Sequence, residues 1–75
     1  MNFAEQIERL EKAHELIRME KTGSAAIFAA KLGISLSQLY SDLDFFKDLS
    51  ADVKYSVKKE TFYYAEATYL DFATI

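Results

Sequence analysis

The first two thirds of the chain place apolar side chains at three- and four-residue intervals, which is the spacing of one helix face. The first run predicts a helix from Asn2 to about Lys21, and Asn2 and Glu5 have the spacing of a capping box. Thr22-Gly23-Ser24 then ends this helix and opens the next. The expected buried face carries Phe3, Ile7, Leu10, His14 and Ile17.

Two shorter helices joined by a sharp turn are predicted over residues 24–49. Ser24 is a suitable N-cap for a run of helix formers at positions 25–32. Gly33 can adopt positive φ and close that helix. The short connection predicts a helix-turn-helix.

The second of these helices carries its own start signals. Ser35 can cap it, and Gln38 completes the spacing of a capping box. Ile34 and Leu39 have the spacing of a hydrophobic staple. The residues expected to face the core from the two helices are Ala25, Phe28, Ala29, Leu32, Leu39, Leu43, Phe46 and Leu49.

From Val53 the apolar period changes to two, which is typical of a half-exposed strand. Apolar and polar residues alternate to Lys58, and a turn is expected at Lys59-Glu60 or beside it. Thr61 to Ala65 form a return strand rich in β-prone residues. The chain is therefore predicted to be α+β, a winged helix-turn-helix in which three helices precede a β-hairpin wing.

The 75 residues leave room for one small domain, predicted at positions 1–66. Residues 67–75 form an apolar tail, expected to dock on the domain or on a partner. The chain has no cysteine, no secretory signal pattern and no apolar run of membrane-spanning length, which favours a cytoplasmic protein with no membrane partner.

Catalytic and cofactor chemistry find little support in this sequence. It contains no Gly-rich phosphate loop and no nucleophile–base pattern, so enzymatic activity, a cofactor and a small-molecule substrate are not expected. Glu11-x-x-His14 is half of a carboxylate-bridged metal motif without the other half. His14 is therefore interpreted as a packed or hydrogen-bonded residue and not as a metal ligand.

The predicted helix-turn-helix resembles the small winged helix-turn-helix domains of bacterial transcription regulators, of the DeoR and biotin-repressor types. The resemblance covers about residues 7–66. Its motifs are Arg9-Leu10-Glu11-Lys12, Lys21-Thr22-Gly23, Leu32-Gly33-Ile34-Ser35 and Leu39-Tyr40-Ser41-Asp42-Leu43-Asp44. It implies that the third helix enters the major groove of DNA and that the wing contacts the backbone or minor groove.

That resemblance selects a set of candidate DNA contacts on the third helix and the wing. Gln can read adenine in the major groove, although its position here also explains it as a capping residue. The wing lysines can contact phosphates, or they can equally serve to protect an exposed strand edge. The candidates are Ser35, Ser37, Gln38, Tyr40, Ser41, Lys54, Lys58 and Lys59.

The chemistry of the third helix departs from a typical DNA reader. Its first turn lacks the arginines that bind guanine and phosphate. Between Ser35 and Leu49, Lys47 is set against three aspartates, a local charge of −2 within a chain of net charge −3. Asp44 and Asp48 are expected on the outward face, with Asp42 to the side. Carboxylates facing phosphate repel it.

The same face carries more apolar side chains than a DNA reader needs. A contiguous exposed apolar patch marks an interaction site, although single exposed apolar residues are ordinary. The candidate protein-interface residues are Ala26, Ile27, Ala30, Leu36 and Phe45. Two functions are thus predicted. The first is a transcription-regulator-type module associated with DNA through weak or atypical readout. The alternative is a protein-interaction or self-association module, the latter a homodimer, that reuses the helix-turn-helix face.

Overall fold

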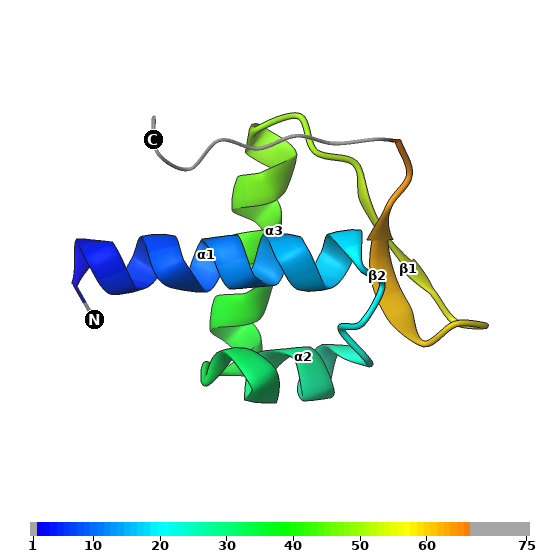
Figure 1. Ribbon diagram of the computed structural model, residues 1–75, viewed down its shortest axis with the longest axis horizontal. Helices are drawn as coiled ribbons and strands as arrows, with labels where there is room; N and C mark the ends of the chain where they lie inside the picture. The colour runs from blue at the N-terminus through cyan, green and yellow to red at the C-terminus, as the bar shows by residue number, and fades with distance from the viewer. Residues whose placement is uncertain (1, 67–75) are drawn as a thin grey trace.

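The computed structural model describes residues 2–66, which form three helices followed by an antiparallel hairpin (Figure 1). The predicted tail at 67–75 lies outside the described residues. This α+β order is compatible with a winged-helix layout. The elements are α1 Phe3–Arg18, α2 Ala25–Leu32, α3 Leu36–Asp48, β1 Val53–Ser56 and β2 Thr61–Tyr64.

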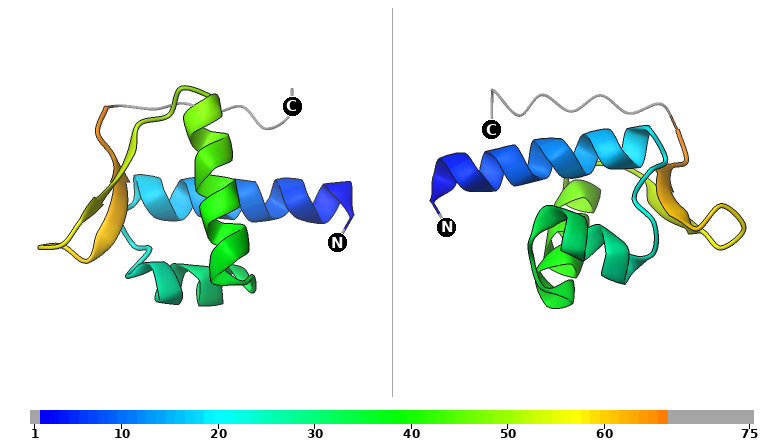
Figure 2. Two further views of the ribbon diagram at one scale, coloured as in Figure 1. Left: turned by 180° about the vertical axis from the view of Figure 1, so that it is seen from behind. Right: turned by 60° about the horizontal axis from the view of Figure 1, so that its bottom comes forward.

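Helix α1 begins as predicted, at a complete capping box. Asn2 accepts a hydrogen bond from the Glu5 backbone, and the Glu5 carboxylate accepts one from the Asn2 backbone. The helix ends at Arg18, three residues before the predicted end, and Glu20 just beyond it has φ 56°. The prediction that Phe3 faces the core is wrong. Its side chain is 66% exposed, because the first turn of α1 extends past the helices beneath it (Figures 1 and 2).

The turn between α2 and α3 follows the sequence signals closely. Ser24 and Ser35 cap the two helices, and Gly33 closes α2 with φ 69°. The predicted capping box of α3 is only half formed. Ser35 Oγ accepts a hydrogen bond from the Gln38 backbone, but the Gln38 carboxamide donates to Asp42 at 3.0 Å instead of returning to the cap.

The hairpin is shorter than predicted and its turn is longer. Val53 pairs with Tyr64 and Ser56 with Thr61 in an antiparallel register, and residues 57–60 form the turn. Both strands therefore stop one or two residues earlier than the alternating pattern indicated. Ser56 Oγ accepts a hydrogen bond from the Lys59 backbone at 3.1 Å, which satisfies the turn with a side chain in place of a further ladder bond.

The core lies where the three helices meet the inner face of the hairpin. Helices α2 and α3 pack together, and α1 contacts both α2 and β2. Aromatic rings link the layers, since Phe28 and Phe62 lie 5.7 Å apart between ring centroids. The buried apolar residues are Leu10, Ala13, Ile17, Phe28, Ala29, Leu39, Leu43, Phe46, Ala51 and Phe62.

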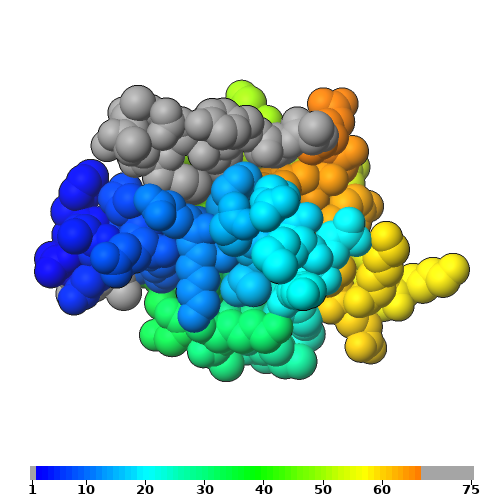
Figure 3. All heavy atoms as spheres, viewed as in Figure 1, coloured from blue at the N-terminus to red at the C-terminus, as the bar shows by residue number. Residues whose placement is uncertain are grey.

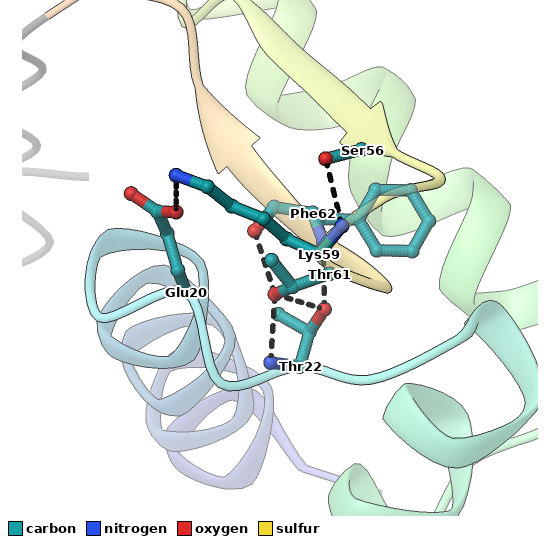
Figure 4. A network of polar contacts seen from close by, with 6 residues as sticks. All are labelled: Glu20, Thr22, Ser56, Lys59, Thr61 and Phe62. Atoms are coloured by element: carbon teal, nitrogen blue, oxygen red, sulfur yellow. Dashed lines mark hydrogen bonds and ion pairs between the residues drawn. The ribbon is translucent and has the colours of Figure 1, made fainter.

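A buried pair of threonines ties the connection between α1 and α2 to strand β2 (Figure 4). The Thr22 backbone donates to Thr61 Oγ1 at 3.1 Å, and the Phe62 backbone donates to Thr22 Oγ1 at 2.8 Å. The two hydroxyl oxygens lie 3.0 Å apart. One edge of the hairpin is therefore bonded to its own domain, and the outer strand β1 is left at the surface.

Candidate interaction groove between α3 and the hairpin

A groove of about 480 Å³ lies among α2, α3 and the hairpin, and we call it the tyrosine groove. Ala25, Tyr40, Tyr55 and Phe62 line it. Tyr55 and Phe62 are cross-strand partners on the inner face of the hairpin, with ring centroids 4.9 Å apart. Phe62 is buried, whereas Tyr40 is 51% exposed and Tyr55 is 39% exposed. The groove thus has an apolar floor and two accessible phenol rings as walls.

Exposed apolar side chains also occur on the elements that carry the groove, although only Tyr40 and Tyr55 of them line it. Seven large apolar or tyrosine side chains are exposed in the part of the chain that the structure describes. Five of them lie on α2, α3, β1 or the hairpin turn, and they are Ile27, Leu36, Tyr40, Tyr55 and Val57. Phe3 and Met19, at the two ends of α1, are the other two.

The solvent-facing side of α3 is polar and carries no cation in its first two turns. Ser37, Ser41, Asp44 and Asp48 are all exposed, and their three- and four-residue spacing places them along one stripe. Tyr40 is also exposed, at the edge of the stripe nearer the hairpin. The structure therefore does bring the predicted Ser37, Tyr40 and Ser41 to the surface of this helix.

Asp42 differs from the expectation that it adds negative charge beside the outward face. It is 5% exposed, and both its oxygens accept hydrogen bonds from Arg9 of α1, at 2.8 and 2.9 Å. Its carboxylate also accepts from Gln38. The exposed charge of α3 consequently comes from Asp44, Asp48 and Lys47, two negative and one positive, and is −1 where the sequence indicated −2.

The Gln38 carboxamide is committed by the same network. A glutamine that reads adenine needs both its amide nitrogen and its oxygen directed at the base. The Gln38 nitrogen instead donates to Asp42, on the side of α3 that faces α1. The Ser35 hydroxyl oxygen caps α3 by accepting a hydrogen bond from the Gln38 backbone, although Ser35 is exposed to solvent.

The three wing lysines fall into two groups. Lys59 forms an ion pair with Glu20 at 3.1 Å, which draws it toward the end of α1 (Figure 4). Lys54 on β1 and Lys58 in the turn are exposed, and within residues 2–66 they form no ion pair. Two of the three predicted phosphate contacts are thus available at the surface.

The predicted protein-interface residues do not form one patch. Ala26, Ile27 and Ala30 are exposed on α2, and Leu36 is 44% exposed at the start of α3. Phe45 is half-buried and packs against the core. It lines a second groove, between α1 and α3, together with Phe3 and Gln6. Nine residues separate Leu36 from Phe45, which places them on opposite sides of the helix.

His14 is buried and hydrogen-bonded, as predicted. Its Nδ1 lies 2.7 Å from the Tyr64 hydroxyl. Burial lowers the pKa of His14; the charge of Glu15 raises it by less, and the charge of Arg18 lowers it slightly further. Burial raises the pKa of Tyr64. Residues 2–66 contain no cluster of three or more His, Cys, Asp or Glu side chains that could hold a metal ion.

Several residues of the site escaped the sequence reasoning. Tyr55 and Phe62 are predicted only as strand residues, and no local pattern indicates that their rings line a groove with Tyr40. Val57 was expected to alternate within a strand, yet it lies in the turn and is 82% exposed. Arg9 lies beside the apolar face of α1 and not on it, so its buried pairing with Asp42 has no local signal in the sequence.

No protein-family model matches this sequence, no curated protein matches it, and no solved structure matches it. Over the described residues, every helix is too short or too polar to cross a bilayer.

Proposed function

We infer that this chain is a protein-interaction module on a winged helix-turn-helix scaffold, and that the tyrosine groove is its contact surface. The observation that carries this inference is the groove lining itself, in which the rings of Tyr40 and Tyr55 are 51% and 39% exposed beside the buried Phe62. Burial of apolar surface is the main driving force of protein association, and a groove with exposed aromatic walls offers such surface. Exposed aromatic residues beside a groove also suit an interface, where tyrosine is enriched.

The polar side chains of α3 favour a protein partner for this chain and disfavour binding to the major groove of DNA. Nucleic-acid affinity depends on cations that release counterions from phosphates, and base reading depends on uncommitted Arg, Lys, Asn or Gln side chains. The exposed stripe of α3 offers two serines and two aspartates, and Gln38 is bonded to Asp42. Asp44 and Asp48 would repel phosphates at this position.

Site-specific photo-crosslinking in cells that express the chain tests this function. Replacement of Tyr40 by a benzophenone amino acid puts the probe in the groove wall, and replacement of Glu11, which is exposed on α1, gives a matched control. Protein adducts, including adducts with a second copy, are expected at position 40 and not at position 11. Equal yields at the two positions, or nucleic acid as the main adduct at position 40, would contradict the proposal.

A DNA-associated role is the second candidate, and Lys54 and Lys58 favour it. Both lysines are exposed, and the hairpin that carries them projects from the domain (Figures 1 and 3). Two phosphate contacts give a weak affinity for DNA. A plot of the logarithm of the binding constant against the logarithm of the salt concentration should have a slope of about −2. Fluorescence anisotropy with a labelled duplex at low salt measures this. Binding at tens of micromolar that Lys54→Gln and Lys58→Gln abolish would favour this role, and no binding would exclude it.

A further inference from the structure

The apolar stripe of α1 is only partly covered by the residues that the structure describes. Ile7 lies one turn after Phe3, and His14 lies two turns after Ile7 on the same side of the helix. Exposure rises along this stripe away from the hairpin, from 8% at His14 through the half-buried Ile7 to 66% at Phe3. The first half of α1 therefore presents apolar surface that residues 2–66 do not fully bury.

This part of α1 forms a groove with α3, which we call the α1–α3 groove. Its volume is about 320 Å³, and its apolar lining consists of Phe3, Ile7, Leu10 and Phe45. Ile7 and Phe45 come from the two different helices, and both are half-buried at the edge of the core. The groove is therefore an extension of the core that is open on one side.

The charged side chains that line the α1–α3 groove are paired with each other. The Arg9 guanidinium donates to both oxygens of Asp42, and the Gln38 carboxamide donates to the same carboxylate. Within residues 2–66 no buried side-chain polar atom lacks a hydrogen-bond partner. The groove thus calls for apolar side chains and not for a charged ligand.

The chain leaves the hairpin beside the two helices that form this groove. The Tyr64 hydroxyl lies 2.7 Å from His14 Nδ1 on α1. The Ala65 backbone donates to the Asp52 carbonyl oxygen at 2.9 Å, four residues after the last residue of α3. Helix α3 crosses α1, with the hairpin on one side of the crossing and the first half of α1 on the other (Figures 1 and 2). A chain that continues along α1 toward its start therefore passes the end of α3 and arrives at the groove.

Positions 67–75 have sufficient length for this path. Ile7 lies about 10 Å from His14 along the axis of α1, since seven residues rise about 1.5 Å each. Phe72 comes eight residues after Tyr64, and an extended chain spans about 26 Å over that separation. More than half of this reach remains for the detour around the end of α3.

The same positions carry the side chains that the groove calls for. Between Ala67 and Ile75 the one charged residue is Asp71, and the large apolar or aromatic residues are Tyr69, Leu70, Phe72 and Ile75. Leu70 and Phe72 are two positions apart, so an extended backbone directs both to one side and Asp71 to the other. One side of such a segment can enter an apolar groove while its carboxylate faces water.

We propose that residues 67–75 occupy the α1–α3 groove of their own chain, with Leu70 and Phe72 against Ile7 and Phe45. A segment tethered by so short a connection has an effective concentration on the order of 1 mM, so a separate chain has to bind more tightly to displace it. The docked segment completes the core beneath the first half of α1. This inference is independent of the proposed function, which concerns the tyrosine groove.

Paramagnetic broadening in the full chain locates the segment. The sequence contains no cysteine, so Thr74→Cys gives a single attachment site for a nitroxide close to Leu70 and Phe72 and leaves both unchanged. Broadening of the amide signals should be strongest in the first two turns of α1 and around Phe45. It should be weaker around Tyr40 and Tyr55, which line the other groove.

Substitutions inside the segment test the two anchoring side chains. Leu70→Ser combined with Phe72→Ser should abolish the localised broadening, whereas Asp71→Ser, the matched control between them, should retain it. In the chain without the label, the double substitution should speed amide hydrogen exchange at residues 7–10 by at least about tenfold, because burial of one such side chain contributes roughly that factor. Circular dichroism confirms that each variant is folded.

The other possible results would overturn the inference. Broadening of similar strength over the whole domain would show that the segment has no fixed site. Strongest broadening around Tyr40 and Tyr55 would place it in the tyrosine groove. A mixture of nitroxide-labelled chains with isotopically enriched chains that lack the nitroxide should show no localised broadening. Broadening of the α1–α3 groove signals in that mixture would make a second copy the host of the segment.

Discussion

The guanidinium of Arg9 and the carboxylate of Asp42 form two parallel hydrogen bonds, from Nε to Oδ2 at 2.8 Å and from Nη2 to Oδ1 at 2.9 Å. The two side chains are only 9% and 6% exposed. This pair joins α1 to α3 and sets the position of the helix that forms one wall of the tyrosine groove. Such two-point geometry fixes orientation as well as distance.

Replacement of Asp42 by asparagine should destabilise the domain strongly. The change preserves shape but leaves the Arg9 guanidinium near an uncharged group, and loss of one partner of a buried pair costs about 3–5 kcal/mol. Urea unfolding followed by circular dichroism measures the free energy of unfolding. Asp44→Asn, on the exposed side of the same helix, should change it by less than about 0.5 kcal/mol. Equal losses of unfolding free energy in the two variants would show that the buried Arg9–Asp42 pair does not stabilise the fold more than an exposed side chain does.

The hydroxyl of Thr22 should be worth more to stability than its methyl group. Thr22→Val keeps the volume but removes the acceptor of the Phe62 N–H, and an unsatisfied buried donor costs about 1–3 kcal/mol. Thr22→Ser keeps the acceptor and loses one methyl, a cost of about 1 kcal/mol. Thermal unfolding of both variants gives the comparison. If the serine variant is the less stable one, the hydrogen bonds contribute less than the packing.

The two glycines should respond differently to alanine. Gly33 has φ 69° and open space around it, so Gly33→Ala meets the backbone penalty alone, about 1–2 kcal/mol. Gly23 has φ 74°, and a Cβ there would lie 2.8 Å from Ile27 Cγ2. Gly23→Ala should therefore lose more. Ile27→Ala in the same chain should recover part of the difference, since it removes Cγ2 but keeps the Ile27 Cβ position, 3.1 Å from the new methyl. Chemical denaturation of the three variants measures the effect.

Stability should fall as the pH drops below about 6.5, because of His14. Burial lowers the pKa of His14 in the folded state, so the unfolded chain binds more protons between the folded pKa and the ordinary value. The contribution of neutral His14 is complete above about pH 6.5 and declines as the pH falls toward the folded pKa. The chain has no other histidine, and carboxylates titrate at lower pH.

Asparagine at position 14 should remove this pH dependence while it offers an oxygen to the Tyr64 hydroxyl. Unfolding free energies of the two proteins between pH 8 and pH 5 make the comparison. A wild-type chain whose stability is flat over that range would show that His14 titrates equally in both states.

The fold could be predicted from the sequence wherever the signal was local. Ser24, Gly33 and Ser35 act through their own backbone and side chains, so their positions identify the ends of α2 and the start of α3. The hairpin was predicted in outline, but its ends were not. Val57 continues the alternating pattern, although the bond between Ser56 and Lys59 closes the turn around it.

The site could not be predicted to the same degree, because it depends on contacts between distant residues. Asp42 and Arg9 are separated by 33 positions, and nothing local indicates that this aspartate is neutralised while Asp44 is not. Phe45 was expected beside Leu36 because both are apolar residues of one helix. The position of α1 decides that Phe45 is covered and that Tyr40 remains at the surface.

Among the described residues, the Arg9–Asp42 pair and the buried side chains of Leu39, Leu43 and Phe46 hold α3 from its inner side. The exposed residues of the opposite face take no part in these contacts, and they are Ser37, Ser41, Asp44 and Asp48. One side of the helix therefore stabilises the fold, and the other side is available for recognition. Substitutions at these four exposed positions should leave the stability of the fold nearly unchanged. A library randomised at these positions should yield folded proteins with new binding specificity, so the domain could serve as a scaffold for engineered binding proteins.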